Sequence, residues 1–170
     1  MTAVASCLAD CLASAGARPA TEGDAAFFAL LYAALRSDLL GDGSADPVFA
    51  AGLVAMQQRL QAADYRRRYP AAATFLLTWA GQPAGRLVLD ADDERLRLVD
   101  IGLLPAMRGH GLGTAIIAAL RGWASARGLP LTLSVHRSNP RAHALYTRLG
   151  FACSGADAHA KHLFISTEKL

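Results

Sequence analysis

The chain has 170 residues, of which 53% are hydrophobic and 18% are charged, and its formal net charge is +3. This length favours one domain with a full core, and the composition excludes a disordered chain. The mild positive charge suits an anionic ligand but is too small for a nucleic-acid footprint, so we expect no nucleic-acid partner.

The cysteines and the hydropathy pattern indicate the cellular compartment of the protein. Cys7, Cys11 and Cys153 match no zinc spacing, and an odd number of cysteines does not suggest a disulfide framework. We therefore predict a cytoplasmic protein. The apolar N-terminal stretch has no basic start and contains Asp10, which argues against a secretion signal. No run of 18 or more apolar residues occurs, so no membrane association is predicted.

The first residues of the chain leave two alternatives open. Residues 1–14 form either a short alanine-rich helix or a disordered N-terminal extension. We therefore place the folded domain at residues 15–170. Its first element is expected to be a short strand that starts near Arg18 and ends in a polar turn at Asp24.

Two helices are predicted next. Apolar residues at helical spacing predict a helix over 24–40, closed by Gly41, and the loop 41–46 that follows is rich in helix breakers. A second helix is predicted over 47–65, and its apolar stripe consists of Phe49, Leu53, Met56 and Leu60. The basic run 66–68 after it is better explained as a solvated helix end, favoured by the dipole, than as an anion-binding site.

Strands dominate the middle of the chain. Residues 74–80 and 84–90 flank a Gly-Gln-Pro turn and predict a hairpin, and a third strand is expected over 95–104, which makes an antiparallel meander. After one helix, a further strand is predicted over 131–136. A last pair of strands, near 152–156 and 161–168, completes the sheet. The fold class is therefore α/β (α+β), with a mixed, mostly antiparallel sheet of about six to seven strands flanked by about four helices.

A glycine-rich loop joins the third strand of the meander to the next helix. Gly109, Gly111 and Gly113 lack a Cβ atom, so a phosphate could approach the main chain closely. The amides at a helix start also carry the positive end of the helix dipole. A P-loop is excluded because no lysine follows Gly113. A dinucleotide fingerprint is excluded because the third glycine comes one residue early and no acidic residue follows about 20 positions on.

A second motif starts at Asn139, a good N-cap that is followed by Pro140 at the first helical position. The loop Arg108-Gly-His-Gly-Leu-Gly113 resembles the Arg/Gln-x-x-Gly-x-Gly/Ala signature of the GNAT N-acetyltransferase superfamily. The second motif resembles that family's Asn-x-x-Ala-x-x-x-Tyr-x-x-x-Gly-Phe pattern, with Asn139, Ala142, Tyr146, Gly150 and Phe151 at the matching positions. The resemblance covers about residues 15–168 and implies a single GNAT-type domain.

This resemblance implies an acyltransferase that uses acetyl-CoA as its acyl-donor cosubstrate and no metal. The acetyl group would pass to a primary amine by direct attack in a ternary complex. The loop amides would hold the pyrophosphate, and the strand end at 101–104 would diverge from the next strand so that its backbone can bind the pantetheine arm. The residues implied in donor binding are Ile101, Leu103, Leu104, Arg108, Gly109, His110, Gly111, Leu112, Gly113, Thr114, Asn139 and Tyr146.

Tyr146 is the best candidate for the general acid that protonates the departing thiolate. A tyrosine with a pKa of about 10 is nearly matched to a thiol with a pKa of about 8.5. Asn139 and Tyr146 lie on one helix face, about 10 Å apart. Asn139 can therefore both cap its helix and bind pantetheine.

The general base is less certain from the residues alone. Asp100 alternates with Leu96 and Leu98, which predicts an apolar face where desolvation would raise its pKa, although a buried aspartate bonded to backbone amides is an equal alternative. His136, at the end of the next strand, is the second candidate. A deprotonation relayed by water is the third.

The acceptor stays open between small-molecule and peptide amines. A non-catalytic acyl-CoA sensor or partner domain with the same fold is the alternative to an enzyme. A nucleic-acid module built on residues 66–68 is the least favoured reading. Oligomeric state is not readable from the sequence, and a homodimer is the common default.

Overall fold

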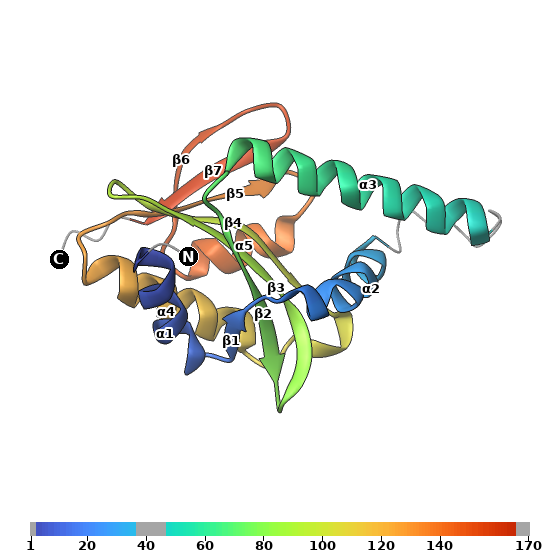
Figure 1. Cartoon of the computed structure of the whole chain (residues 1–170). Coiled ribbons are helices and arrows are strands. Elements are labelled where there is room, and N and C mark those ends of the chain that lie inside the picture. Colours follow the sequence, from blue (N-terminus) through green and yellow to red (C-terminus); the bar gives the residue numbers. More distant parts are fainter. Residues whose placement is uncertain (1–2, 37–46, 166–170) are drawn as a thin grey trace.

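A seven-stranded sheet forms the centre of the molecule, here described from a computed structural model for residues 3–36 and 47–165 (Figure 1). The strand order is β1-β2-β3-β4-β5-β7-β6. All neighbouring strands are antiparallel except β4 and β5, which are parallel. The mixed, mostly antiparallel sheet predicted from the sequence is confirmed.

The elements follow the predicted order along the chain. The strands are β1 (Ala17–Pro19), β2 (Ala73–Trp79), β3 (Gln82–Ala91), β4 (Leu96–Leu103), β5 (Leu131–His136), β6 (Ala152–Ala156) and β7 (Ala160–Ile165). The α-helices of the described ranges are α1 (Ala3–Ala13), α2 (Ala25–Leu35), α3 (Pro47–Arg68), α4 (Leu112–Ser125) and α5 (Pro140–Arg148). The predicted loop 41–46 and the predicted ends at 37–40 and 166–168 lie outside the described residues. None of the described helices is long and apolar enough to cross a bilayer.

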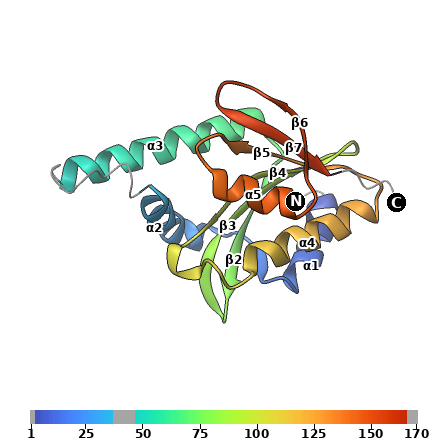
Figure 2. The same ribbon diagram turned by 180° about the vertical axis from the view of Figure 1, so that it is seen from behind.

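The two faces of the sheet differ in character. Helices α1, α4 and α5 cover one face, whereas α2 and α3 lie on the other, as the front and back views show (Figures 1 and 2). The main core lies on the α4 face, where the buried β5 residues Leu131, Leu133 and Val135 meet Ile116 and Leu120 of α4. Alternation along the strands therefore turns the more polar side chains toward α2 and α3.

The N-terminal segment is built into the α4 face. Residues 3–13 form α1, and Leu8 and Leu12 are almost completely buried in the main core. The guanidinium of Arg127 donates a hydrogen bond of 2.8 Å to the Cys7 sulfur and lies 4.0 Å from the centre of the Trp123 ring. Of the two alternatives left open by the sequence, the helix is the one that forms over 3–13.

Three of the four residues predicted as the apolar stripe of the second helix do not face the protein; the side chain of the fourth, Phe49, lies outside the described part. Met56 and Leu60 of α3 are 57% and 59% exposed, and Leu53 is exposed as well. Val54 is buried instead, and Gln61 and Tyr65 follow on the inner side. The prediction from hydrophobic spacing was wrong about which side of α3 faces the protein. The inner side of this helix covers the polar face of the sheet, where side chains need hydrogen-bonding partners.

Asp24 anchors the start of α2. Its carboxylate binds the Arg18 guanidinium through two hydrogen bonds of 2.7 and 2.9 Å and accepts a third, of 2.7 Å, from the Thr21 amide. The Arg18 guanidinium and the Thr21 amide hold the pKa of this buried carboxyl well below its usual range. The ionised carboxylate therefore contributes to the stability of the folded state.

Replacing Asp24 by Asn is expected to lower the thermal unfolding midpoint at pH 7. A carboxyl whose folded pKa is depressed stabilises the protein above its unfolded pKa of about 3.9, and this stabilisation is lost as the pH falls through the folded value. The difference between wild type and Asp24→Asn should thus shrink below about pH 4. Asp93→Asn, in the exposed turn before β4, is the matched control and should show no difference. An equal difference for Asp24→Asn at pH 3 and pH 7 would contradict this assignment.

Candidate active site

Strands β4 and β5 separate part-way along their length. Their parallel ladder pairs Leu96 with Leu131 and ends where Leu98 pairs with Leu133. Both strands continue, to Leu103 and His136, but no further pair joins them. The resemblance implied a divergence at 101–104, and the structure starts it just after Leu98. The far end of β4 therefore has backbone groups on its β5 side that a ligand can bind.

The glycine loop leads from this opening into α4. Gly109 and Gly111 have φ angles of +86° and +83°, in the left-handed region that disfavours side chains. A Cβ atom built at either position meets no atom within 4 Å. The two glycines are therefore needed for the backbone path, and the space above them is open.

The amides of this loop form an anion-binding surface. The first hydrogen bond into α4 runs from the Ala115 amide to the Gly111 carbonyl, at 2.9 Å. The six preceding amides, from Gly109 to Thr114, have no acceptor among the described residues. Unpaired amides at a helix N-terminus attract a phosphate through both hydrogen bonding and the helix dipole.

Neighbouring side chains support the loop. Arg108 donates a hydrogen bond of 3.1 Å from Nε to the Leu103 carbonyl, which joins the loop to the end of β4. The His110 ring stacks on Trp79 of the β2–β3 hairpin, with 5.7 Å between the ring centres. Sequence reasoning missed Trp79, although an exposed tryptophan at a hairpin tip is a signal of a contact.

Helix α5 carries the second motif along the α4 face. The Asn139 side-chain oxygen accepts a hydrogen bond of 3.0 Å from the Ala142 amide, so the predicted N-cap is confirmed. Its amide nitrogen keeps two donors for another partner. About two helical turns further on, Tyr146 packs its ring against the edge of Phe151, with 5.6 Å between the ring centres.

Tyr146 is held in its neutral form. Its side chain is only 7% exposed, and no described residue forms a hydrogen bond with its hydroxyl. Burial, and secondarily the negative charge of Asp100, raise the pKa of Tyr146 to about 12. Asp100 therefore lies near enough to act on the Tyr146 hydroxyl, although the two residues come from different elements.

Asp100 does not lie on the apolar face that its spacing from Leu96 and Leu98 predicted. The β3–β4 ladder pairs Leu89 with Leu98 but Val88 with Asp100, so Val99 is an extra residue in a β-bulge. The bulge turns Asp100 to the α2 and α3 face. There its carboxylate forms an ion pair of 2.6 Å with Arg86, and both side chains stay partly exposed, at 26% and 17%.

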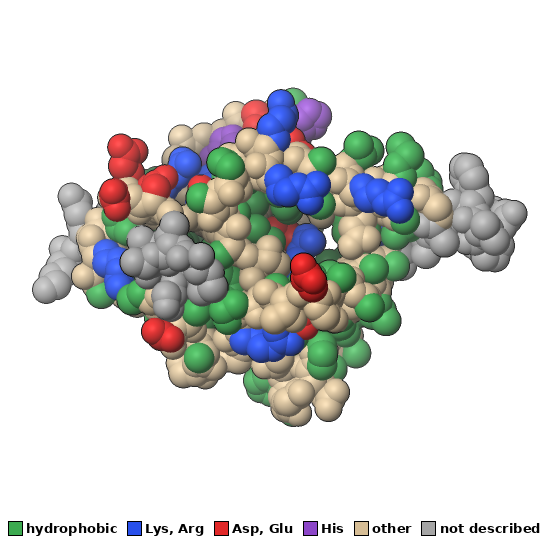
Figure 3. All heavy atoms as spheres, viewed as in Figure 1, with side chains coloured by type: hydrophobic (Ala, Val, Ile, Leu, Met, Phe, Trp, Pro, Cys, Tyr) green, Lys and Arg blue, Asp and Glu red, His purple; other side chains and the backbone are tan. Residues whose placement is uncertain are grey.

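Sequence reasoning missed three residues around Asp100. Arg86 of β3 also donates a hydrogen bond of 3.3 Å to Gln61 of α3. Burial and the Asp100 charge raise the pKa of Tyr65, also on α3, so this second tyrosine lies at the same site. Figure 3 shows the surface hollowed below α3, with a basic side chain inside the hollow. Arg86 is the one basic residue of the largely apolar strand β3, and this was the available signal.

His136 lies on the other side of the opening, at the end of β5. It is exposed, and its Nδ1 lies 2.6 Å from the Ser138 hydroxyl and 3.3 Å from the Ser138 amide. These bonds hold the ring beside the start of α5. Across the described residues, no group of three or more His, Cys, Asp and Glu side chains converges as a metal site requires.

The part of the chain that contains this glycine loop and the two diverging strands matches a known family. The family model described as Acetyltransferase (GNAT) family matches residues 44–151. The chain belongs to the GNAT acetyltransferase family. The match runs from before α3 to Phe151, so it spans both sequence motifs and confirms the predicted resemblance. Among curated proteins no match is found.

Solved GNAT structures resemble the chain over different lengths. A nourseothricin acetyltransferase is 29% identical, with a TM-score of 0.51, over 58% of this chain and 66% of that one, just under two thirds of its length. A ribosomal-protein alanine N-acetyltransferase from Escherichia coli is 27% identical, with a TM-score of 0.50, over 58% and 71%. The PaiA N-acetyltransferase from Thermoplasma acidophilum, solved with coenzyme A, shares the fold at 13% identity, with a TM-score of 0.64, over 88% and 97%.

Proposed function

We propose that the chain is an acetyl-CoA-dependent N-acetyltransferase that moves the acetyl group to a primary amine by direct attack in a ternary complex. The observation that carries this proposal is the row of six unpaired amides from Gly109 to Thr114, next to the opening between β4 and β5. Solved members of the fold that hold coenzyme A support it. Family membership supports acetyl transfer as the reaction class.

The donor would lie across the loop and the opening. The amides 109–114 would bind the pyrophosphate, with Arg108 at its side. The backbone groups of Ile101 and Leu103 on the β5 side would bind the pantetheine arm, which takes the place of the missing β5 ladder. The Leu104 amide and carbonyl are already bonded to Ala84 and Met107, so the Leu104 backbone would not take part as the sequence predicted. The Asn139 amide nitrogen, free while its oxygen caps α5, would donate to the same arm.

Tyr146 would protonate the departing thiolate. Its pKa of about 12 in the free protein is farther from the ordinary thiol value of about 8.5 than a tyrosine at 10 would be. The two causes of the shift, burial and the Asp100 charge, disfavour any anion, including the thiolate itself. The thiol pKa therefore rises in the same site, which keeps the proton transfer close to balanced.

The amine acceptor would enter from the α2 and α3 face. Asp100 and His136 lie on either side of the opening, and an ionised Asp100 would attract an ammonium group. Two of these relatives are named for an antibiotic and for a protein alanine, so a small-molecule or a peptide amine fits the comparisons equally. We place the reaction in the cytoplasm.

Coenzyme A release from acetyl-CoA across a panel of amines tests this function. The panel holds amino acids, polyamines, aminoglycosides and peptides with free N-termini or lysines. We expect release with one class, together with a rise in the unfolding midpoint when acetyl-CoA is added. A raised midpoint without release on any amine would favour a non-catalytic acyl-CoA sensor. If acetyl-CoA neither raises the unfolding midpoint nor releases coenzyme A with any amine, the assignment of the glycine loop is refuted.

A further inference from the structure

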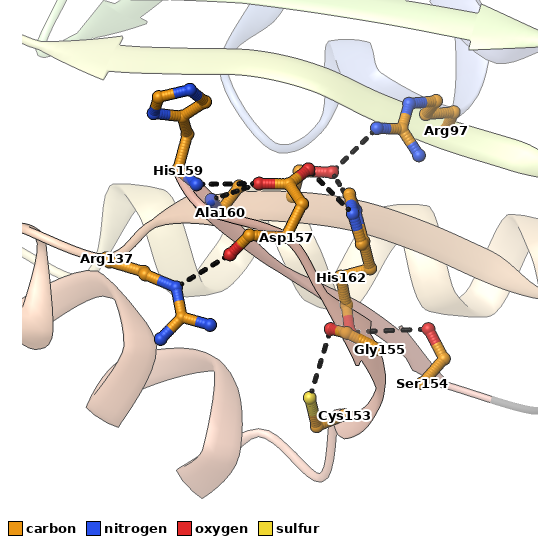
Figure 4. Close-up of polar contacts among 10 residues, drawn as sticks. Arg97, Arg137, Cys153, Ser154, Gly155, Asp157, His159, Ala160 and His162 are labelled. Atoms are coloured by element: carbon orange, nitrogen blue, oxygen red, sulfur yellow. Dashed lines mark hydrogen bonds and ion pairs between the residues drawn. The ribbon is translucent and has the colours of Figure 1, made fainter.

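A chain of polar side chains crosses from β4 to the loop between β6 and β7. The Arg97 guanidinium donates a hydrogen bond of 2.8 Å to the Ser134 hydroxyl, which lies 2.9 Å from Nδ1 of His162. Nε2 of His162 lies 3.2 Å from Oδ2 of Asp157. Figure 4 shows Arg97, His162 and Asp157 directed toward one another from three different segments.

This row of hydrogen-bonded side chains begins at the opening between β4 and β5. Ser134 directly follows Leu133, the last β5 residue that pairs with β4. Leu133 and Val135 point into the main core, so alternation turns Ser134 to the α2 and α3 face. The bulge at Val99 turns Asp100 to that same face. Ser134 and Asp100 therefore lie on opposite sides of the opening, on the face assigned to the acceptor.

The hydrogen bonds that link these side chains have a consistent donor-to-acceptor direction. Because Asp157 accepts the proton on Nε2, Nδ1 of the neutral ring is an acceptor, and the Ser134 hydroxyl donates to it. Ser134 in turn accepts from Arg97, and a hydroxyl oxygen has a second lone pair that can accept one more proton. The far end is fixed: the amides of His159 and Ala160 donate to Asp157 at 2.7 and 2.8 Å.

We propose that Ser134, His162 and Asp157 form the relay that removes the proton from the acceptor amine. This inference rests on the proposed function and assigns the base that the sequence left open. An N–H bond of the ammonium breaks, and its proton passes to the Ser134 oxygen, directly or through one water. The Ser134 proton moves to Nδ1 of His162, and the freed lone pair on nitrogen attacks the thioester carbonyl. Asp157 stabilises the imidazolium that forms.

The charges around His162 suit this role. Asp157 lies against one ring nitrogen, and hydrogen bonds from the Ala160 and His159 amides lower its pKa, so it stays ionised. Arg97 faces the ring from β4 through Ser134, and the partly exposed ring releases its proton to solvent after each cycle. Other titratable groups nearby are Tyr69, which accepts from Arg97 Nε at 3.0 Å, and His136, on the same face of β5. Arg137 also lies nearby and donates a hydrogen bond of 2.8 Å to the Asp157 carbonyl. On the opposite face, Lys161 contacts His143.

The decisive experiment compares His162→Gln with His159→Gln on the amine that the panel identifies. The His159 side chain is exposed, and only its backbone amide joins the network. We expect His162→Gln to lower kcat at pH 7 about 100-fold. In a plot of kcat against pH, the rise should move from the range where imidazoles titrate to the pKa of the acceptor amine, about 8 to 10. His159→Gln should keep the wild-type rate and profile, and both variants should keep the KM for acetyl-CoA.

A second variant separates the relay from a merely structural role. Asp157→Asn keeps an oxygen for the two loop amides but removes the charge beside the imidazole. The amide nitrogen that replaces Oδ2 donates to Nε2, so the ring keeps its proton on Nδ1 and cannot accept one from Ser134. We therefore expect kcat to fall sharply while the KM for acetyl-CoA is unchanged. Ser134→Ala combined with His162→Gln should be no slower than His162→Gln alone, because the two residues act as one unit.

The possible results separate the relay from the proposed function. A His162→Gln variant with the wild-type rate and profile on an active amine overturns the relay and leaves the acetyltransferase standing. Loss of rate in His159→Gln to the same extent also overturns the relay, because it points to the loop rather than to the imidazole. A wild type that acetylates no amine overturns the proposed function and the relay together.

Discussion

Replacing Tyr146 by Phe is expected to lower kcat for acetyl transfer about 100-fold or more while the affinity for acetyl-CoA is retained. The substitution removes only the hydroxyl, and no described residue loses a hydrogen bond with it. Because the pKa of Tyr146 is about 12, the hydroxyl stays protonated across the neutral range. The loss should therefore be the same from pH 6 to pH 9, and the wild type should show no falling limb from this group there.

Tyr65→Phe is the comparison that makes this result specific. Tyr65 also lies near Asp100 with a raised pKa, but it comes from α3, on the acceptor side. If Tyr146 is the acid, Tyr65→Phe should change the KM for the amine more than it changes kcat. Loss of kcat in Tyr65→Phe with a fully active Tyr146→Phe would transfer the role of general acid to Tyr65. Steady-state kinetics with both substrates varied, and acetyl-CoA binding by calorimetry, provide the measurements.

Replacing Gly111 by Ala is expected to weaken acetyl-CoA binding about 100-fold, equivalent to the loss of two charge-assisted hydrogen bonds of about 1.5 kcal/mol each. At a φ of +83°, an alanine side chain strains the backbone that directs the loop amides toward the phosphates. The added methyl group also projects into the open space above the loop. Titration calorimetry with acetyl-CoA measures this effect directly.

Gly128→Ala controls for the strain alone. Gly128 follows the other end of α4, with a φ of +67° and no atom near a built Cβ. Both variants should lose about 1–2 kcal/mol of unfolding free energy, because each places alanine in the left-handed region. Only Gly111→Ala should lose the ligand-induced rise in the unfolding midpoint. Equal acetyl-CoA affinity in the two variants would disprove the role of the loop amides.

Local signals along the chain were sufficient for the parts of the site that lie close together in sequence. The positions of Gly109 and Gly111, the N-cap at Asn139 and the stripe around Tyr146 depend on backbone conformation within a few residues. The order β2-β3-β4 could also be anticipated, because short turns join these antiparallel neighbours. These features led to the GNAT family without any tertiary information.

Long-range pairing decided the acceptor side, which no local pattern contains. The bulge at Val99 reversed the face of Asp100, because a one-residue shift moves every later side chain to the opposite side of a strand. Helix α3 turned its polar side inward for a related reason: it covers Arg86 and Asp100, which need partners.

The sequence by itself therefore determined the family, the glycine loop and the helix that carries Tyr146, since short-range backbone preferences encode all three. Only the tertiary structure decided which side chains meet on the α2 and α3 face. Ser134, His162 and Asp157 come from β5, from β7 and from the loop before β7, and they contact one another only because β7 inserts between β5 and β6. Strand pairing sets the contacts between segments that lie so far apart in the chain. The positions of these three residues in the sequence gave no indication that they would be in contact.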